Sequence, residues 1–167
     1  IAQLESETAA ADLYSRTNYG ACVGLSKTTG SDSDTGGGGL IFFMAAKLLN
    51  QPTKLRVTAG GGSLDFPAKS SVQLGHTAAV LYLQENYPGK EEELSGFLNM
   101  DIKSVGPANK GGPCGGLGSA IAFVSLALQK PVKKFVAVTG RISDCGAVGF
   151  VTGIPQKVIA AILGNMK

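Results

Sequence analysis

A glycine-rich loop holds the residue that is best placed to do chemistry in this sequence. Residues 110–118 read Lys-Gly-Gly-Pro-Cys-Gly-Gly-Leu-Gly, and an apolar run typical of a helix follows at once. Glycine and proline let the backbone turn sharply, and proline suits the first turn of a helix. Cys114 should therefore lie beside unpaired backbone N–H groups at the positive end of a helix. A thiol in such a place can act as a nucleophile, and the backbone at Gly112, Pro113 and Gly115 can hold the oxyanion of an acyl transfer.

A nucleophile needs a proton acceptor, and the sequence offers two candidates. His76 is the only histidine, and it follows a glycine at the front of a predicted helix. A lone histidine is more often structural or exposed than catalytic. Lys157 lies in the last predicted helix, where a solvated lysine is the ordinary expectation. Both roles stay open for each residue. Cys114 also has a purely structural alternative, because free cysteine is among the most buried residue types.

The other cysteines and the histidine count exclude several kinds of site. Cys22 stands in a short apolar strand and is predicted to be inert, whereas Cys145 stands in a turn and is predicted to be exposed. Three cysteines without a Cys-x-x-Cys spacing indicate neither a disulfide framework nor a zinc site. One histidine excludes a multi-histidine metal centre. We therefore expect no metal and no cofactor, and reduced thiols point to an intracellular protein, cytoplasmic or organellar.

Length and composition favour one domain. The chain has 167 residues, which is enough for a domain with a real hydrophobic core. The net charge is +3 and no dense cluster of Lys and Arg occurs, so we expect no nucleic-acid partner. The apolar runs are broken well before membrane-spanning length, so we expect no membrane partner. The chain begins at Ile1 without a signal-peptide pattern, and we expect a fragment of a longer chain with other domains.

Hydrophobic periodicity predicts the elements that position these residues. Strands are expected at residues 21–25, 40–49, 54–58, 100–105 and 135–139, with two short extended pieces within 141–151 that a turn at 144–146 joins. Helices are expected at residues 1–15, 71–87, 91–98, 120–128 and 154–163, with polar or glycine-rich loops at 26–39 and 60–67. Strands and helices mix without strict alternation, so the sequence predicts a mixed α/β (α+β) fold.

Two segments resemble the proteolytic domain of Lon-type proteases. Segment 136–161 contains Thr-Gly-Arg-Ile-Ser-Asp-Cys-Gly-Ala-Val and then an apolar helix with Ala-Ala, and it is similar to the family's Thr-Gly-Glu-Ile-Ser/Thr-x-x-Gly-x-Val and the helix after it. Segment 112–116, Gly-Pro-Cys-Gly-Gly, is similar to the family's Gly-Pro-Ser-Ala-Gly, and the spacing between the two motifs matches without a gap. The likeness covers roughly residues 20–163 and is looser before the glycine loop.

This resemblance implies a Lon-protease-like domain of mixed α/β type, which is shared with birnavirus polyprotein proteases. Residues 1–19 would form an N-terminal helix and linker, and residues 20–167 the Lon-like domain, with the family's closing strand and helix missing after Lys167. The family uses a Ser nucleophile and a Lys general base. A lysine acts as a base when burial lowers its pKa, and the nucleophile at a helix start has amides nearby for the oxyanion.

The resemblance also implies altered catalytic positions. It puts Cys114 at the Ser position and Pro155 at the Lys position, and it retains Thr139, which helps to orient the lysine. Arg141 replaces the family's Glu. Lys157 falls on the second lysine of the family motif. It lies two residues past Pro155, about half a helical turn away, and is expected to face elsewhere.

Three functions follow from these departures. The favoured one is a peptidase domain whose chemistry is lost or altered, and which serves as a scaffold or homo-oligomerisation module of a larger protein. The second is an active cysteine peptidase for protein or peptide substrates, with Cys114 as nucleophile, Thr139 in support, and Lys157 or His76 as base. The third is remote: segment 113–119 also resembles the phosphate loop of small-molecule kinases of the galactokinase and homoserine kinase type, although the spacing is one residue short.

Overall fold

The structure, a computed structural model, describes residues 19–27, 39–49, 55–60, 63–96, 98–104 and 111–166. Its elements in chain order are β1 (Ala21–Lys27), β2 (Gly39–Leu48), β3 (Leu55–Gly60), α2 (Phe66–Asn86), η1 (Lys90–Leu94), β4 (Leu98–Ser104), η2 (Pro113–Gly115), α3 (Gly116–Leu128), β5 (Ala137–Val138), β6 (Arg141–Ile142), β7 (Val148–Gly149) and α4 (Ile154–Leu163). The helix expected at 1–15 and most of the loop at 26–39 lie outside the described residues. The boundary between residues 19 and 20 therefore stays a prediction.

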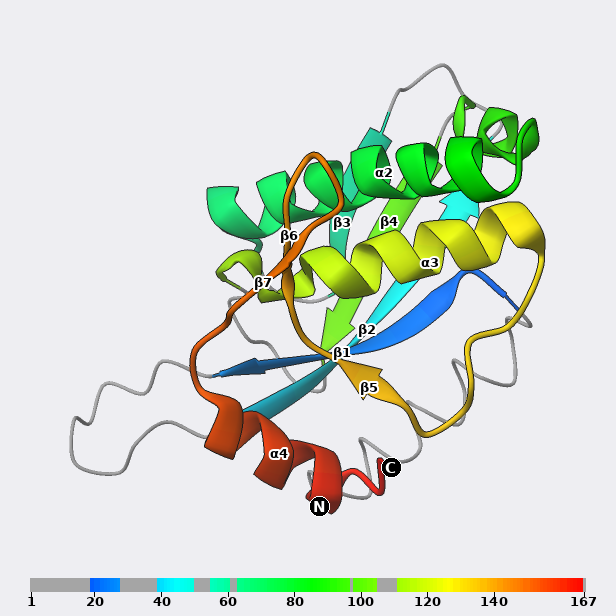
Figure 1. Ribbon diagram of the computed structural model, residues 1–167. Helices are drawn as coiled ribbons and strands as arrows, with labels where there is room; N and C mark the ends of the chain where they lie inside the picture. Colours follow the sequence, from blue (N-terminus) through cyan, green and yellow to red (C-terminus); the bar gives the residue numbers. More distant parts are fainter. Residues whose placement is uncertain are drawn as a thin grey trace.

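A five-stranded mixed sheet forms the centre of the fold, in the order β3-β4-β2-β1-β5 (Figure 1). The pairs β1–β2 and β2–β4 are antiparallel, whereas β1–β5 and β3–β4 are parallel. The mixed α/β class expected from the sequence is confirmed, and β1 and β2 lie in the middle of the sheet, where both faces can be covered.

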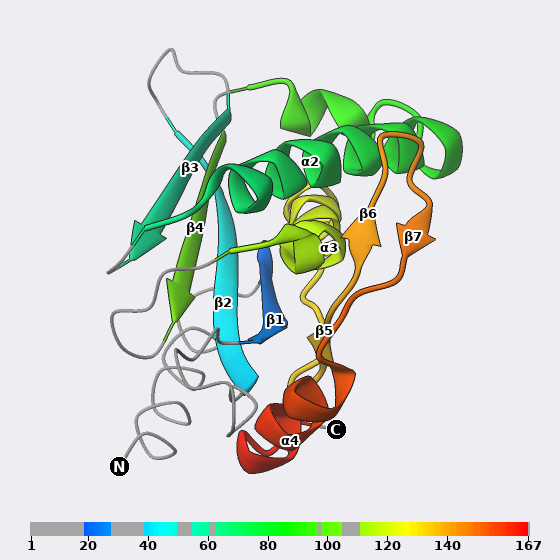
Figure 2. The same ribbon diagram turned by 90° about the vertical axis from the view of Figure 1, so that its left-hand side faces the viewer.

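Two helices cover one face of the sheet. Figure 1 shows α2 and α3 side by side, and in Figure 2 both lie on the same side of the strands. The main core cluster joins them to the sheet through side chains such as Met44 on β2, Leu83 on α2 and Phe123 on α3, all fully buried. Burial of apolar side chains of this size contributes about 1.5–3 kcal/mol each, so this interface supplies much of the stability.

The opposite face of β1 and β2 contacts α4. Successive side chains of a strand point to opposite faces. Val23, Ile41 and Phe43 therefore point away from the main core, and they form a second cluster with Ala160 of α4. A side chain at Gly39 would collide with the backbone of α4. The glycine thus permits the close approach that fixes this helix against the start of β2.

Local features explain three of the differences between the expected and the observed elements. Helix α2 starts at Phe66 rather than at residue 71, because Asp65 caps it by accepting the Ala68 N–H at 2.7 Å and Pro67 occupies the first turn, where proline is tolerated. The helix expected at 91–98 is a short 3₁₀ turn, and its last predicted residue begins β4. Strand β5 is limited to two residues, since Phe135 has a φ of 60°, which no strand accommodates.

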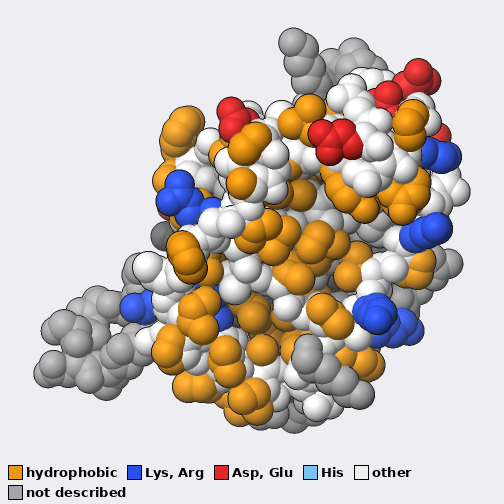
Figure 3. Space-filling model, viewed as in Figure 1, with side chains coloured by type: hydrophobic (Ala, Val, Ile, Leu, Met, Phe, Trp, Pro, Cys, Tyr) orange, Lys and Arg blue, Asp and Glu red, His pale blue; other side chains and the backbone are white. Residues whose placement is uncertain are grey.

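The β6–β7 hairpin packs on the middle of α2 and the first half of α3, next to an apolar groove. The two extended pieces expected within 141–151 are confirmed as this hairpin. Figure 3 shows hydrophobic side chains gathered around a hollow on this face of the molecule. The groove has a volume of about 610 Å³, and its walls include Tyr82, Ile121 and Val148. In the described part of the chain, no helix has both the length and the apolar character needed to cross a bilayer.

Candidate active site

Cys114 lies in the 3₁₀ turn η2, and the next residue, Gly115, is the N-cap of α3. Two backbone hydrogen bonds tie the turn and the start of α3 to the segment after β5. The Gly140 N–H donates to the Cys114 carbonyl at 3.2 Å, and the Leu117 N–H donates to the Gly140 carbonyl at 3.1 Å. Gly140 therefore fixes the position of Cys114 relative to Thr139 and Arg141, the two residues that flank Gly140 in the sequence.

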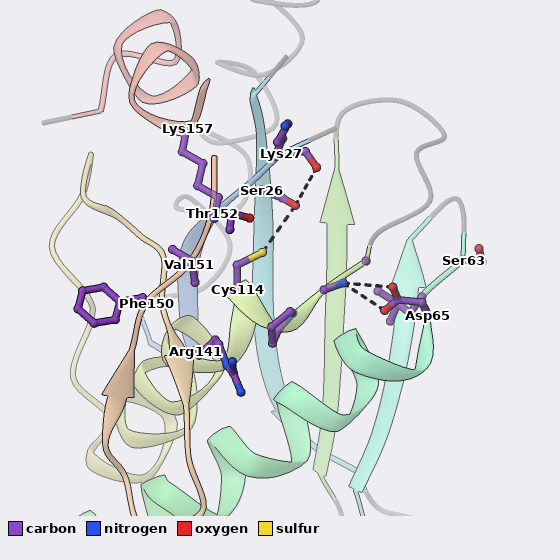
Figure 4. Close-up of a pocket in the computed structure, with 14 residues that line it drawn as sticks. Ser26, Lys27, Ser63, Asp65, Cys114, Arg141, Phe150, Val151, Thr152 and Lys157 are labelled. Atoms are coloured by element: carbon purple, nitrogen blue, oxygen red, sulfur yellow. Dashed lines mark hydrogen bonds between the residues drawn. The ribbon is translucent and has the colours of Figure 1, made fainter. Parts of the chain in front are cut away.

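The Cys114 thiol lines a cavity of about 800 Å³. The side chain is half-buried, and its Sγ lies 3.8 Å from the hydroxyl of Ser26, near the end of β1. Figure 4 shows Cys114 in the middle of this cavity, between residues from β1, the β6–β7 hairpin, α4 and the start of α2. A thiol with open space on one side and polar neighbours on the other can reach a bound substrate.

Lys157 lines the same cavity, which overturns the expectation of a solvated lysine. Its side chain is 2 % exposed, and its Nζ donates to the Thr139 hydroxyl at 3.1 Å. That hydroxyl donates in turn to the Leu25 carbonyl of β1 at 3.3 Å. Figure 4 shows Lys157 extending from α4 toward Cys114. Thr139 is thus the hydrogen-bond partner of Lys157 rather than of residue 155.

Pro155 does not stand where a base would face the thiol. It is exposed in the first turn of α4. The helix begins after Gly153, whose φ of 71° turns the chain sharply into it. Two residues span about 200° of an α-helix, so Pro155 and Lys157 point in nearly opposite directions. The half-turn separation expected from the sequence is correct, but it directs the proline outward and the lysine inward.

His76 is not among the residues that line the cavity of Cys114, and its contacts fit the structural alternative. Its Nε2 lies 3.2 Å from the Leu94 carbonyl of η1. Its ring meets the edge of Phe123 with the centroids 5.2 Å apart. These contacts join α2 to η1 and α3, which is the structural role that a lone histidine usually has.

Asp65 reduces the number of backbone amides that could bind an oxyanion. The Gly112 N–H donates to both carboxylate oxygens of Asp65, at 3.1 and 3.3 Å, and Pro113 has no N–H to give. Gly112 and Pro113 therefore shape the turn rather than face an oxyanion. The amides of Cys114 and Gly115 remain as the candidate donors next to the thiol.

Sequence reasoning missed Ser26 and Asp65 as neighbours of this site. Asp65 had a readable signal, because an Asp two residues before a proline is typical of a helix start. Ser26 had none, since its place beside the thiol depends on the sheet order, which brings β1 under the turn.

The other two thiols differ sharply from each other. Burial raises the pKa of Cys22 to about 12, which agrees with an inert thiol. Cys145 is exposed, as expected, and a hydrogen bond with the Ser143 hydroxyl lowers the pKa of its thiol, with a further contribution from the Ala147 N–H. Within the residues that the structure describes, no group of three or more His, Cys, Asp or Glu side chains is arranged to hold a metal ion.

Comparison with known proteins places this site in a family context. Residues 10–167 match the model of the Lon protease (S16) C-terminal proteolytic domain. The chain is 29% identical over 157 residues to Lon protease homolog 1, mitochondrial, of Arabidopsis thaliana, covering 93% of this chain and 16% of that protein. It is 30% identical over 154 residues to the mitochondrial Lon protease homolog of Mus musculus, covering 89% and 16%.

A third relative matches over a shorter stretch. Lon protease homolog 2, peroxisomal, of Caenorhabditis briggsae is 34% identical over 125 residues, covering 64% of this chain and 16% of that protein. The chain therefore spans about one sixth of the length of each of these relatives.

Proposed function

Because this chain belongs to the family of Lon protease C-terminal proteolytic domains, we propose that it hydrolyses peptide bonds with Cys114 as nucleophile and Lys157 as general base. One observation carries the proposal: a buried amine, oriented by a threonine hydroxyl, lines the same cavity as the half-buried thiol. This favours an active cysteine peptidase over the scaffold expected from the sequence, which depended on Pro155 as the residue facing Cys114. Family membership also removes the support for the kinase alternative.

The reaction would proceed as acyl transfer in two halves. Lys157 takes the proton of the Cys114 thiol as the sulfur attacks the scissile carbonyl carbon. The resulting oxyanion accepts hydrogen bonds from backbone amides at the turn, for which Cys114 and Gly115 are the candidates. Lys157 returns the proton to the departing amine, and the C–N bond breaks to leave a thioester. Water, deprotonated by Lys157, then hydrolyses the thioester and restores the thiol.

Thr139 and Ser26 have supporting positions in this scheme. The Thr139 hydroxyl occupies one N–H of the Lys157 amine and is itself held by the Leu25 carbonyl, so the amine has one preferred orientation. The Ser26 hydroxyl lies within 3.8 Å of the sulfur and can stabilise it by donating a hydrogen bond.

The wider setting follows from the family. We expect protein or peptide substrates, further domains in a longer chain, self-association into a homo-oligomer, and an intracellular location. Several relatives are named as mitochondrial or peroxisomal proteins, which supports the location.

The test compares the protein with four variants on labelled casein and a quenched peptide library. Cys114→Ala and Lys157→Met should each lower turnover at least about 100-fold. Cys114→Ser should keep measurable turnover, because a lysine base can also activate a hydroxyl. His76→Gln should leave turnover unchanged.

The scaffold function makes the opposite predictions. A protein without turnover, whose Cys114 resists iodoacetamide while Cys145 reacts, would refute the enzymatic proposal. Unchanged assembly of Cys114→Ala would then fit a scaffold.

A further inference from the structure

The charges around Cys114 are unequal. Among the described residues that line the cavity, three are basic, Lys27, Arg141 and Lys157, and one is acidic, Asp65. Lys157 is assigned to proton transfer. The remaining pair, Lys27 and Arg141, has no part in the proposed chemistry, so its effect on a bound substrate can be considered separately.

The single carboxylate is directed toward the backbone. Asp65 accepts the Ala68 N–H at 2.7 Å and the Gly112 N–H at 3.1 Å, and it caps the N-terminus of α2. Amides and the positive end of a helix offset much of a carboxylate's charge. The field that a substrate meets in the cavity is therefore mainly that of the two cations.

Both cations are attached next to direct partners of the nucleophile. Arg141 follows Gly140, which exchanges hydrogen bonds with the turn of Cys114, and its backbone is paired in the β6–β7 hairpin. Lys27 follows Ser26, whose hydroxyl lies 3.8 Å from the sulfur. The Lys27 stem lies against Gly153, where an added Cβ would come within 2.9 Å of the Lys27 Cδ. The two positions are thus fixed relative to the thiol.

The two side chains are available to a ligand. Both residues are exposed, and neither side chain forms a hydrogen bond or an ion pair with another described residue. In Figure 4, Arg141 lies on the opposite side of Cys114 from Lys157. A peptide bound with its scissile carbonyl at the Cys114 sulfur would pass close to Lys27 and Arg141.

We propose that Lys27 and Arg141 form a cationic subsite that selects peptides with an aspartate or glutamate close to the scissile bond. The inference rests on the proposed peptidase function. Guanidinium groups pair with carboxylates through two parallel hydrogen bonds, whereas a lysine supplies a point charge. Because both cations are partly solvated, each should contribute only about a two- to fivefold preference, and the two together about tenfold.

One arm of the test measures the charge around the thiol without any peptide cleavage. Cys114 is alkylated with iodoacetate, which is anionic, and with iodoacetamide, which is neutral, and each rate is divided by that of N-acetylcysteine. The quantity compared is the normalised iodoacetate rate divided by the normalised iodoacetamide rate. A cationic site gives a ratio above one, and the ratio falls with added salt. Arg141→Gln and Lys27→Gln should each lower it about two- to fivefold. Lys134→Gln removes an exposed lysine outside the cavity lining and is the matched control.

The second arm compares quenched peptides that differ only in Asp or Asn beside the scissile bond. The inference predicts a higher kcat/KM for the Asp peptide, reduced in both cavity variants and retained in Lys134→Gln. A ratio near one that neither cavity variant changes would overturn the inference, as would equal cleavage of the two peptides. If no peptide is cleaved but the ratio behaves as expected, the peptidase function fails while the cationic site stands.

Discussion

Replacing Lys157 by methionine separates a catalytic lysine from a structural one. The two side chains are similar in length, so Lys157→Met fills the same space in α4 without the amine. In the described part of the chain, the amine has one hydrogen bond, to Thr139 at 3.1 Å, and no carboxylate partner. A protein that needed this position only for packing would have little reason to bury an amine there.

The expected change in stability follows from three contributions. Losing the bond to Thr139 costs about 1 kcal/mol, and the threonine hydroxyl keeps its own bond to the Leu25 carbonyl. Removing a buried amine that has one hydrogen bond and no carboxylate partner relieves up to several kcal/mol of desolvation cost in a dry core. Because the amine lines an open cavity, part of that cost is already offset by water. The net effect should be a stabilisation of about 1–3 kcal/mol, or about 2–4 °C in Tm for each kcal/mol.

Activity should change in the opposite direction. Loss of a general base lowers kcat by about 10²–10⁴-fold. The assay is therefore a pair of measurements on one variant, thermal unfolding and casein turnover, with Lys134→Met as the control that changes an exposed lysine. The reasoning would be refuted if the variant unfolded at a lower temperature while iodoacetamide alkylated its Cys114 at the wild-type rate, since the lysine would then be structural.

Three further predictions concern the surroundings of the site. Asp65→Asn keeps an oxygen to cap α2 but loses the second acceptor for the Gly112 N–H, so kcat should fall about tenfold or more with little change in Tm. An equal loss of kcat in Asp65→Ala and Asp65→Asn, with a lowered Tm in both, would indicate that Asp65 serves only as a helix cap. His76→Leu should lower the free energy of unfolding through lost contact with Leu94 and leave kcat/KM unchanged, which urea titration and peptide cleavage together can check. The pKa of the Cys22 thiol is raised from 9.0 to about 12, so its contribution to stability is complete below pH 9 and is lost as the pH rises toward 12; urea titrations at pH 8 and pH 10.5 should show this loss, and a Cys22→Val variant should not show the same dependence.

The sheet and the hairpin could be predicted from the sequence because local signals agree with tertiary packing. The apolar run at 40–46 is continuous because β2 is covered by helices on one face and by α4 on the other, and such strands do not alternate. The turn with Cys114 could also be predicted, since glycine and proline directly before an apolar helix indicate a tight turn. These features depend on residues that are close in the chain.

The proposed proton acceptor, Lys157, could not be predicted in the same way. Which residue of a short helix faces a cavity depends on where the helix starts and on what covers its other side. Pro155 and Lys157 differ by half a turn, so an alignment that assigns the base to one of them excludes the other, and the sequence contains no independent sign of the inward face. The sequence left both roles of His76 open for a related reason: its contact with Leu94 joins elements that pack only in the folded chain.

The left-handed residue at the start of α4 makes the function depend on a residue count. Gly153 fixes the direction in which the helix leaves the hairpin, and Lys157 then follows four residues later on the inner face. One residue inserted between them would rotate the lysine by about 100° and advance it by about 1.5 Å. The amine would leave Thr139, and Ala160 of the same helix would shift on the sheet, while the core under α2 and α3 survived. The composition of this first turn can therefore vary, as the exposed Pro155 illustrates, while the proposed chemistry requires a fixed length.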